Sequence, residues 1–391
     1  MQSNNQQAFL ALVSAGLWTE NEYKEYRDSG VSEPIEWESV YLLSEEQSLF
    51  GVVLSGIERI SDELRPPQAM LLQWIGEVHM LEQKNKAMNG FIAKLMERLR
   101  TAGVNAILVK GQGIAQCYEK PLWRVCGDVD LLLDKENYEK AKTLLAPLAT
   151  SVEKEYVEEL HLGMTLEGWI VELHGTLHSG LSSKIEKGLE GICESIFYDG
   201  RVRSWKNDQT ILYLPRADED VVYVFTHILQ HFYKGGIGLR QICDWCRLLW
   251  TYRDSLNHGL LESRIRKMGL MSEWKAFGAF AVEYLGMPQE AMPLLNDNHN
   301  EDEDENDNNV NLNANLKRKA ERILEFVMEV GNMGHNRDSS YSKYPYIVRK
   351  AYSFGRRCSD LWRHARIFPL DSFRFMPTIM SHGIQSAMRG E

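Results

Sequence analysis

The chain has 391 residues and a formal net charge of −11, from 44 basic and 55 acidic side chains. This length is sufficient for two or three domains with a full core. Because no run of about eighteen apolar residues occurs, we expect no membrane span, and the acidic balance argues against a nucleic-acid substrate. The first residues lack the basic and apolar regions of a signal peptide, and the six cysteines form no disulfide pattern, so we expect a cytoplasmic protein.

Residues 1–100 are predicted to form an N-terminal helical region. Apolar side chains recur at spacings of three, four or seven from Trp74 to Leu99, which indicates one long helix with a single apolar stripe. Two prolines, Pro66 and Pro67, precede this helix, and Gly103 fits a C-cap after it.

Residues 101–215 change character and are predicted to form a small α/β module. In chain order it contains strand 106–109, a glycine-bearing turn, a short helix 114–118, strand 129–133, helix 135–148 and strands 169–174 and 210–214.

Residues 216–391 are predicted to form a C-terminal helical domain, because apolar side chains again follow helical spacing. Within it, segment 296–314 is rich in Asn, Asp and Glu and is predicted to be a disordered surface loop. Cys243 and Cys246 have the spacing of a redox or zinc motif, but no second cysteine pair accompanies them, so we interpret them as core thiols. The basic, aromatic segment 343–391 is expected to be solvated helix with aromatic anchors; an anionic partner or membrane surface is the alternative.

Two carboxylates at the start of one predicted strand form the most informative motif. Successive strand side chains alternate between faces, so Asp128 and Asp130 point the same way. Like charges held this close repel unless a cation lies between them. The alternative is an ordinary turn, but the order of glycine turn, Asp-x-Asp strand and later acidic strand favours a Mg²⁺ or Mn²⁺ site.

Other side chains complete a site suited to nucleotide chemistry. Glu172, in the middle of strand 169–174, could supply a third metal ligand and accept a proton from the attacking group; the alternative is that it faces solvent. The turn at Gly111 could bring backbone amides to phosphates because no Cβ obstructs the approach. Lys110 and Arg124 could balance phosphate charge.

The stretch 106–134 resembles the uncharacterised nucleotidyltransferase family of bacterial proteins, part of the DNA polymerase β-like nucleotidyltransferase superfamily. The resemblance lies in the Lys-Gly strand end at Lys110, in Arg124 and in the Asp-Val-Asp-Leu-Leu-Leu strand from Asp128. It continues to the acid-Leu-His strand end, matched by Glu172 and His174. The chain departs from the wider superfamily in its turn, where Gln112 follows the glycine in place of serine or glycine.

The resemblance extends to a helical segment with two histidines four apart and a later Arg and Asp, matched by His227, His231, Arg240 and Asp244. Residues four apart share a helix face, so the two rings could hold a metal or phosphate, or one could simply be packed. The resemblance implies that these residues and His174 contact the nucleotide or the acceptor.

The resemblance implies an α+β fold, in which a small mixed-sheet nucleotidyltransferase core lies between N-terminal and C-terminal helical domains. It also implies a metal-dependent transfer of a nucleoside monophosphate from a nucleoside triphosphate, such as ATP, to an unknown small-molecule or glycan-precursor acceptor. The setting that the resemblance suggests is surface-polysaccharide metabolism. We expect the three carboxylates to lie at the mouth of the largest cleft. The alternatives are a nucleotide-sugar-dependent glycosyltransferase and a nucleotide-binding pseudoenzyme.

Overall fold

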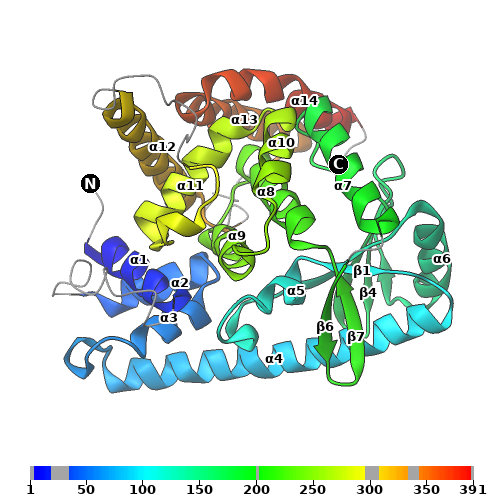
Figure 1. Ribbon diagram of the computed structural model, residues 1–391, viewed down its shortest axis with the longest axis horizontal. Helices are drawn as coiled ribbons and strands as arrows, with labels where there is room; N and C mark the ends of the chain where they lie inside the picture. The colour runs from blue at the N-terminus through cyan, green and yellow to red at the C-terminus, as the bar shows by residue number, and fades with distance from the viewer. Residues whose placement is uncertain (1–3, 19–34, 200–201, 296–307, 333–342, 389–391) are drawn as a thin grey trace.

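A computed structural model describes residues 4–18, 35–199, 202–295, 308–332 and 343–388. A small mixed sheet lies between one very long helix and a group of packed helices (Figure 1). This combination agrees with the predicted α+β class. The division into regions ending at residues 100 and 215 stays a prediction.

The N-terminal region is helical, as predicted. It contains α1 (Asn4–Leu17), α2 (Trp37–Glu46), α3 (Phe50–Ile57) and α4 (Gln68–Thr101). Helix α4 extends along one whole side of the molecule in Figure 1. It begins directly after Pro67. A proline ring clashes with a preceding helical turn, so the helix does not extend to earlier residues. It ends at Thr101, and Gly103, two residues later, takes a φ of 70° and lets the chain turn toward the sheet.

The main sheet has five strands in the order β1-β2-β5-β4-β3. Their bounds are β1 (Ile107–Val109), β2 (Asp128–Leu132), β3 (Ser151–Val152), β4 (His161–Leu166) and β5 (Trp169–His174). Strands β2 and β5 are parallel, and the other neighbours are antiparallel. The parallel register places Asp130 opposite Glu172 and Leu132 opposite His174.

Three details differ from the sequence-based expectations. Helix α5 (Gly111–Ala115) begins at the glycine itself, three residues before the predicted start at residue 114. The predicted strand β7 (Thr210–Leu214) pairs with β6 (Arg203–Asn207) in a separate hairpin. Predicted helix 135–148 divides into α6 (Lys135–Leu145) and a final 3₁₀ turn, because Pro147 removes a backbone donor.

The two faces of the sheet differ in polarity. One face carries Leu108, Val129, Leu131, Val171 and Leu173, which pack in one apolar cluster with α4 and α6. The opposite face carries the polar side chains of β2 and β5, since alternate strand residues point to opposite sides. The polar face lies toward α8 (Ala217–Lys234), whose residues Tyr223 and His227 act electrostatically on Lys110 at the end of β1.

The remaining described helices are α7 (Ser183–Tyr198), α9 (Leu239–Tyr252), α10 (His258–Met268), α11 (Met271–Leu285), α12 (Asn308–Val330), α13 (Tyr346–Ile367) and α14 (Pro369–Met388). Residues 308–314 belong to α12, so the prediction of a loop there is wrong; apolar residues later in the helix stabilise it by packing. Residues 296–307 lie outside the described part. The aromatic anchors expected near the C-terminus are present, because Phe368 and Phe375 are buried.

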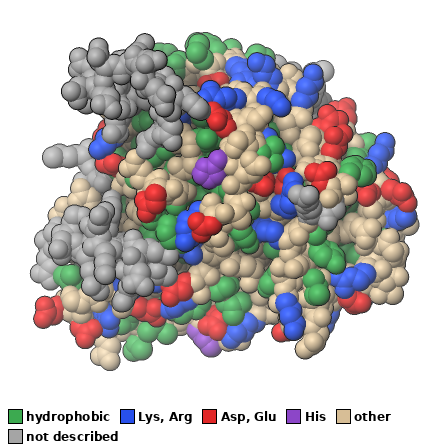
Figure 2. Space-filling view, viewed as in Figure 1, with side chains coloured by type: hydrophobic (Ala, Val, Ile, Leu, Met, Phe, Trp, Pro, Cys, Tyr) green, Lys and Arg blue, Asp and Glu red, His purple; other side chains and the backbone are tan. Residues whose placement is uncertain are grey.

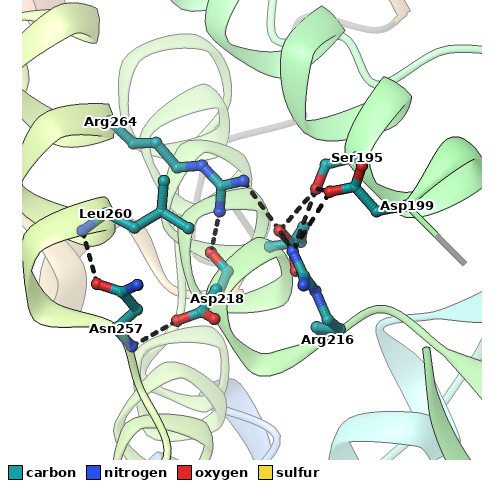
Figure 3. A network of polar contacts seen from close by, with 8 residues as sticks. Ser195, Asp199, Arg216, Asp218, Asn257, Leu260 and Arg264 are labelled. Atoms are coloured by element: carbon teal, nitrogen blue, oxygen red, sulfur yellow. Dashed lines mark hydrogen bonds and ion pairs between the residues drawn. The ribbon is translucent and has the colours of Figure 1, made fainter. Parts of the chain in front are cut away.

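A buried polar network fixes the beginning of α8 against its neighbours (Figure 3). Glu219 is fully buried and accepts hydrogen bonds from Arg216, from Arg264 on α10 and from Ser195 on α7, at 2.7–3.0 Å. Asp218 accepts a bond from the backbone N–H of Asn257 at 2.7 Å. These contacts hold α8 in place on the side away from the sheet.

Cys243 and Cys246 are buried and not disulfide-bonded, in agreement with the interpretation as core thiols. In the described residues, no helix combines the length and the apolar character that crossing a membrane requires.

Candidate functional site

The end of β1 turns sharply into α5 at Lys110 and Gly111. Lys110 has a φ of 53°, a backbone conformation that residues other than glycine rarely adopt. Such a conformation costs of order 1–3 kcal/mol and is maintained where surrounding contacts determine it. Gly111 also has a positive φ, and a Cβ there would lie 3.4 Å from the Asp128 carbonyl oxygen. The turn thus brings the backbone of α5 close to the start of β2.

Asp130 is buried between the Lys110 ammonium and the His174 imidazole. Its Oδ1 lies 2.7 Å from Lys110 Nζ and 2.8 Å from His174 Nε2, so neither group occupies Oδ2. Burial raises the pKa of this carboxyl, but the charge of Lys110 and the hydrogen bond from His174 outweigh burial and hold the pKa below its usual range. Asp130 is therefore an anion at neutral pH.

Asp128 differs from Asp130 although both side chains point to the same face. Among the described residues, none forms a hydrogen bond or an ion pair with its carboxylate. Burial and the nearby negative charge of Asp130 raise the pKa of the Asp128 carboxyl. This carboxylate is thus held close to a second one without a cation of its own.

Glu172 lies between two imidazoles, that of His161 on the neighbouring strand β4 and that of His174 on its own strand β5. Its Oε2 is 3.3 Å from Nε2 of His161 on β4 and 3.4 Å from Nε2 of His174. Hydrogen bonds from His161 and His174 hold the pKa of Glu172 far below its usual range. A carboxylate with so low a pKa holds cations well and is a weak proton acceptor. The alternative, in which Glu172 simply faces solvent, does not describe this side chain, because it contacts both imidazoles.

Asp244 on α9 organises the arginines of the site. Arg124 donates to both of its oxygens, at 3.0 and 2.6 Å, and the Tyr118 hydroxyl donates to Oδ1 at 2.8 Å. Arg240 Nη1 lies 3.4 Å from Oδ2. Asp244 therefore positions the two arginines, and its own negative charge is already balanced.

His227 and His231 lie side by side on α8, with their Nε2 atoms 3.2 Å apart. Burial lowers the pKa of both rings, and the positive charge of Lys110 lowers them further, in His231 to about 4. Both rings are consequently neutral at physiological pH and can each offer a lone pair.

A cavity of about 60 Å³ connects these groups. It is lined by Lys110, Gly111, Ile114, Arg124, Gly127, Asp128, Asp130, Val224, His227, Ile228, Arg240, Gln241 and Asp244. Four of the predicted site residues lie outside this lining, namely Gln112, Glu172, His174 and His231. Gln112 turns away, since its amide donates to Asn85 on α4 at 2.8 Å.

The expectation that the carboxylates lie at the largest cleft is wrong. A surface cleft between the C-terminal half of α4 and Thr210 has a volume of about 720 Å³. The site cavity is smaller because the Lys110 side chain and helix α8 fill the space above β2.

Sequence reasoning missed His161 and Tyr223. His161 belongs to β4, which was not predicted because Gly163 interrupts its apolar pattern. Tyr223 lies on α8, one turn before His227, and its ring centroid is 6.0 Å from Lys110 Nζ. Tyr223 precedes His227 by four residues, and this spacing could have indicated that both side chains lie on the same face of the helix.

The surface seen in Figure 2 mixes acidic and basic side chains over its described part. It presents no continuous basic surface on this face. Strong nonspecific binding of nucleic acid needs such a surface, because it depends on neutralising many phosphates at once.

The mixed sheet thus places a pair of strand carboxylates beside a small cavity that is lined by three cationic and three acidic side chains. Comparison with protein families matches residues 33–286 to the family described as uncharacterised nucleotidyltransferase. The match spans well over half of the chain, and the chain belongs to this family. No curated protein and no solved structure matches it.

Proposed function

We propose that this protein transfers a nucleoside monophosphate from a nucleoside triphosphate to an acceptor hydroxyl or phosphate. The acceptor oxygen would attack the α-phosphorus, the bond to the pyrophosphate oxygen would break, and the acceptor proton would leave to solvent. Family membership supports a transferase of this class. The observation that carries the proposal is the Asp128 carboxylate, which lines the cavity beside Asp130 and forms no ion pair with a described residue, although Lys110 and Arg240 act on it electrostatically.

The carboxylates fit a hard divalent cation such as Mg²⁺ or Mn²⁺. Asp128 has both oxygens available, and the contacts of Asp130 involve only Oδ1. Oxygen ligands of this kind suit Mg²⁺, which keeps several waters and also binds substrate phosphates. When bound, such an ion neutralises the triphosphate and activates the attacking oxygen. Asp128 and Asp130 would hold it, and Glu172 would hold a cation rather than accept the proton.

The basic side chains would orient the triphosphate. Lys110, Arg124 and Arg240 line the same cavity as the aspartates. Asp244 fixes the planes of both guanidinium groups, so less side-chain entropy is lost when phosphate oxygens bind. The neutral His227 ring could donate one further hydrogen bond.

One observation favours a second candidate, a nucleotide-binding protein without catalysis. The Lys110 ammonium forms an ion pair with Asp130 at 2.7 Å and so already supplies a positive charge there. A glycosyltransferase is less compatible with the fold, since four helices and no strand precede β1 in the described residues.

The sharpest test replaces Asp128 by Asn and leaves the Lys110–Asp130 ion pair intact. Purified wild-type protein is incubated with each labelled triphosphate, Mg²⁺ or Mn²⁺ and cell extract, and pyrophosphate is measured. In D128N we expect turnover to fall by orders of magnitude and metal-dependent triphosphate binding to disappear. The fold should gain up to about 1 kcal/mol, because a repulsive charge is removed.

Glu136→Gln is the matched control, since it removes one exposed negative charge from α6. It should leave pyrophosphate release unchanged. Binding of Mg-triphosphate to D128N as tightly as to the wild type would refute the metal site. Triphosphate binding by the wild type without pyrophosphate release would favour the non-catalytic candidate.

A further inference from the structure

A second group of possible metal ligands lies beside the carboxylate pair. His161 and His174 are direct register partners on β4 and β5, and Glu172 lies on the same face two residues before His174. Their ligand atoms all lie within 4.8 Å of one another. No other three His, Cys, Asp or Glu residues in the described ranges bring their ligand atoms together in this way.

The distances within this group match those around a small cation. Two ligands about 2.1 Å from a zinc ion at the tetrahedral angle are about 3.4 Å apart. The two observed separations from Glu172 Oε2 are 3.3 and 3.4 Å. The two imidazole nitrogens lie within 4.8 Å of each other, so the rings would have to approach by up to about 1.4 Å to reach the same spacing.

The rings are held in place before any ion arrives. The His161 and His174 rings stack with centroids 4.8 Å apart and an angle of 18°, and Tyr156 stacks on the outer face of His161. The three ligand side chains are 25, 29 and 16 % exposed, so an ion can reach them from solvent. Preorganised ligands lose little rotamer freedom when they bind.

Binding would not leave a buried charge unpaired. His174 Nε2 also contacts Asp130 Oδ1, and an ion on this nitrogen would displace that hydrogen bond. Asp130 would keep its ion pair with Lys110, whose ammonium is 2.7 Å away. The cost of replacing the His174 contact is therefore limited.

We propose that His161, Glu172 and His174 form a binding site for a divalent first-row transition metal ion, of which Zn²⁺ and Co²⁺ are probes. Two imidazoles and one carboxylate suit such ions, whereas Mg²⁺ prefers oxygen ligands alone. The proposal needs no nucleotide and stands independently of nucleotidyl transfer. In this site Glu172 shares its metal ion with the imidazole nitrogens of His161 and His174.

The experiment uses full-length protein freed of metal with a chelator and titrated with CoCl₂, followed by visible absorption, and with ZnCl₂, followed by calorimetry. We expect one ion per chain, and a 100-fold excess of MgCl₂ should not displace it. His161→Gln should weaken Co²⁺ affinity at least ten-fold while the fold persists, because the polar contact of His161 is with Glu172. His174→Gln should weaken it likewise.

The matched control is the double variant H227Q/H231Q, which removes two neighbouring imidazoles from α8 that have no carboxylate in contact. It should bind Co²⁺ like the wild type. No Co²⁺ absorption in the wild type, unchanged affinity in H161Q, displacement by Mg²⁺ or loss of the ion in H227Q/H231Q would each overturn the proposal. Co²⁺ binding by a D128N protein that releases no pyrophosphate would separate this site from the proposed catalysis.

Discussion

Asp244 balances the charge of two arginines and holds a tyrosine hydroxyl. Its partner Arg124 is only 4 % exposed, so Asp244→Asn would leave a guanidinium without a counter-charge in the interior. Breaking one side of a buried ion pair costs about 3–5 kcal/mol. We predict a loss of this size in the free energy of unfolding, measured by denaturant titration.

The control for this prediction is Glu262→Gln, which breaks the ion pair with Arg266 on the surface of α10. Exposed pairs contribute about 0–1 kcal/mol, so this change should be small. Replacing Arg124 and Asp244 together by Met should cost less than D244N, because the buried guanidinium is removed together with its counter-charge. Arg240, which then loses its contact at 3.4 Å, is more exposed, at 16 %. An unfolding free energy of D244N equal to that of the wild type would show that Asp244 does not balance Arg124.

At the residue scale, local spacing could be predicted and partners could not. The alternation of Asp128 and Asp130 follows from strand geometry, and the structure places both on one cavity. The ion pair between Lys110 and Asp130 depends on which strands are neighbours. His161 enters the site only because β4 pairs with β5. The residue pattern within a strand does not indicate which distant strand will pair with it.

At the scale of elements, Glu273 connects three helices. It lies on α11, accepts a hydrogen bond from the Tyr233 hydroxyl on α8 at 3.3 Å and faces the charge of Asp371 on α14. Burial, with the charge of Asp371, raises the pKa of Glu273 to about 8. In the unfolded chain the same carboxyl ionises near its ordinary value, about 4.3.

The sign of the pH effect follows from proton counts. Between about pH 4.5 and pH 8 the folded protein retains a proton on Glu273 that the unfolded chain has lost, so this group lowers stability as pH rises. Glu273→Gln should therefore raise the free energy of unfolding by about 1–5 kcal/mol at pH 8. At pH 4 it should have little effect. Thermal unfolding at both pH values measures the difference.

Glu283→Gln on the same helix is the control, because that carboxyl is 46 % exposed. Its effect should be within about 0.5 kcal/mol at either pH. If E273Q is no more stable than the wild type at pH 8, the buried carboxyl is not protonated in the folded protein.

Elements with a strong period were predicted and irregular ones were not. Strand β5 has the predicted bounds 169–174, since its side chains alternate cleanly. Strand β4 and the hairpin strand β6 were missed, because glycine or charged residues interrupt the alternation. The first turns of α12 are rich in asparagine, so composition alone predicted a loop there, whereas packing further along stabilises a helix.

At the scale of the whole molecule, helices beyond the family match cover the core of the matched part. The Phe232 ring lies 5.0 Å from that of Phe326 on α12 and 6.1 Å from that of Phe368, and Tyr233 lies 4.9 Å from Phe375 on α14. A chain ending at residue 295 would expose these rings. We predict that it aggregates, measured as the soluble fraction after expression.

The control keeps the full length and replaces Leu370 and Phe373 by Ser on the exposed side of α14, where they are 82 and 67 % exposed. This variant should remain as soluble as the wild type. A soluble, cooperatively unfolding chain ending at residue 295 would show that α12–α14 are dispensable for the fold. The sequence could not predict this coverage, since apolar periodicity identifies a helix face but not its partner.

The first helix of the chain is completed by residues made much later. Trp18, just after α1, donates a hydrogen bond from its indole to the carbonyl of Leu285 at 2.6 Å, and α1 packs against α11. A ribosome adds about 5–20 residues each second. Helix α1 can pack on α3 soon after residue 57 is made, but the part that packs on α11 must wait many seconds during synthesis. Nascent chains of this protein should depend on chaperones until residue 285 has emerged.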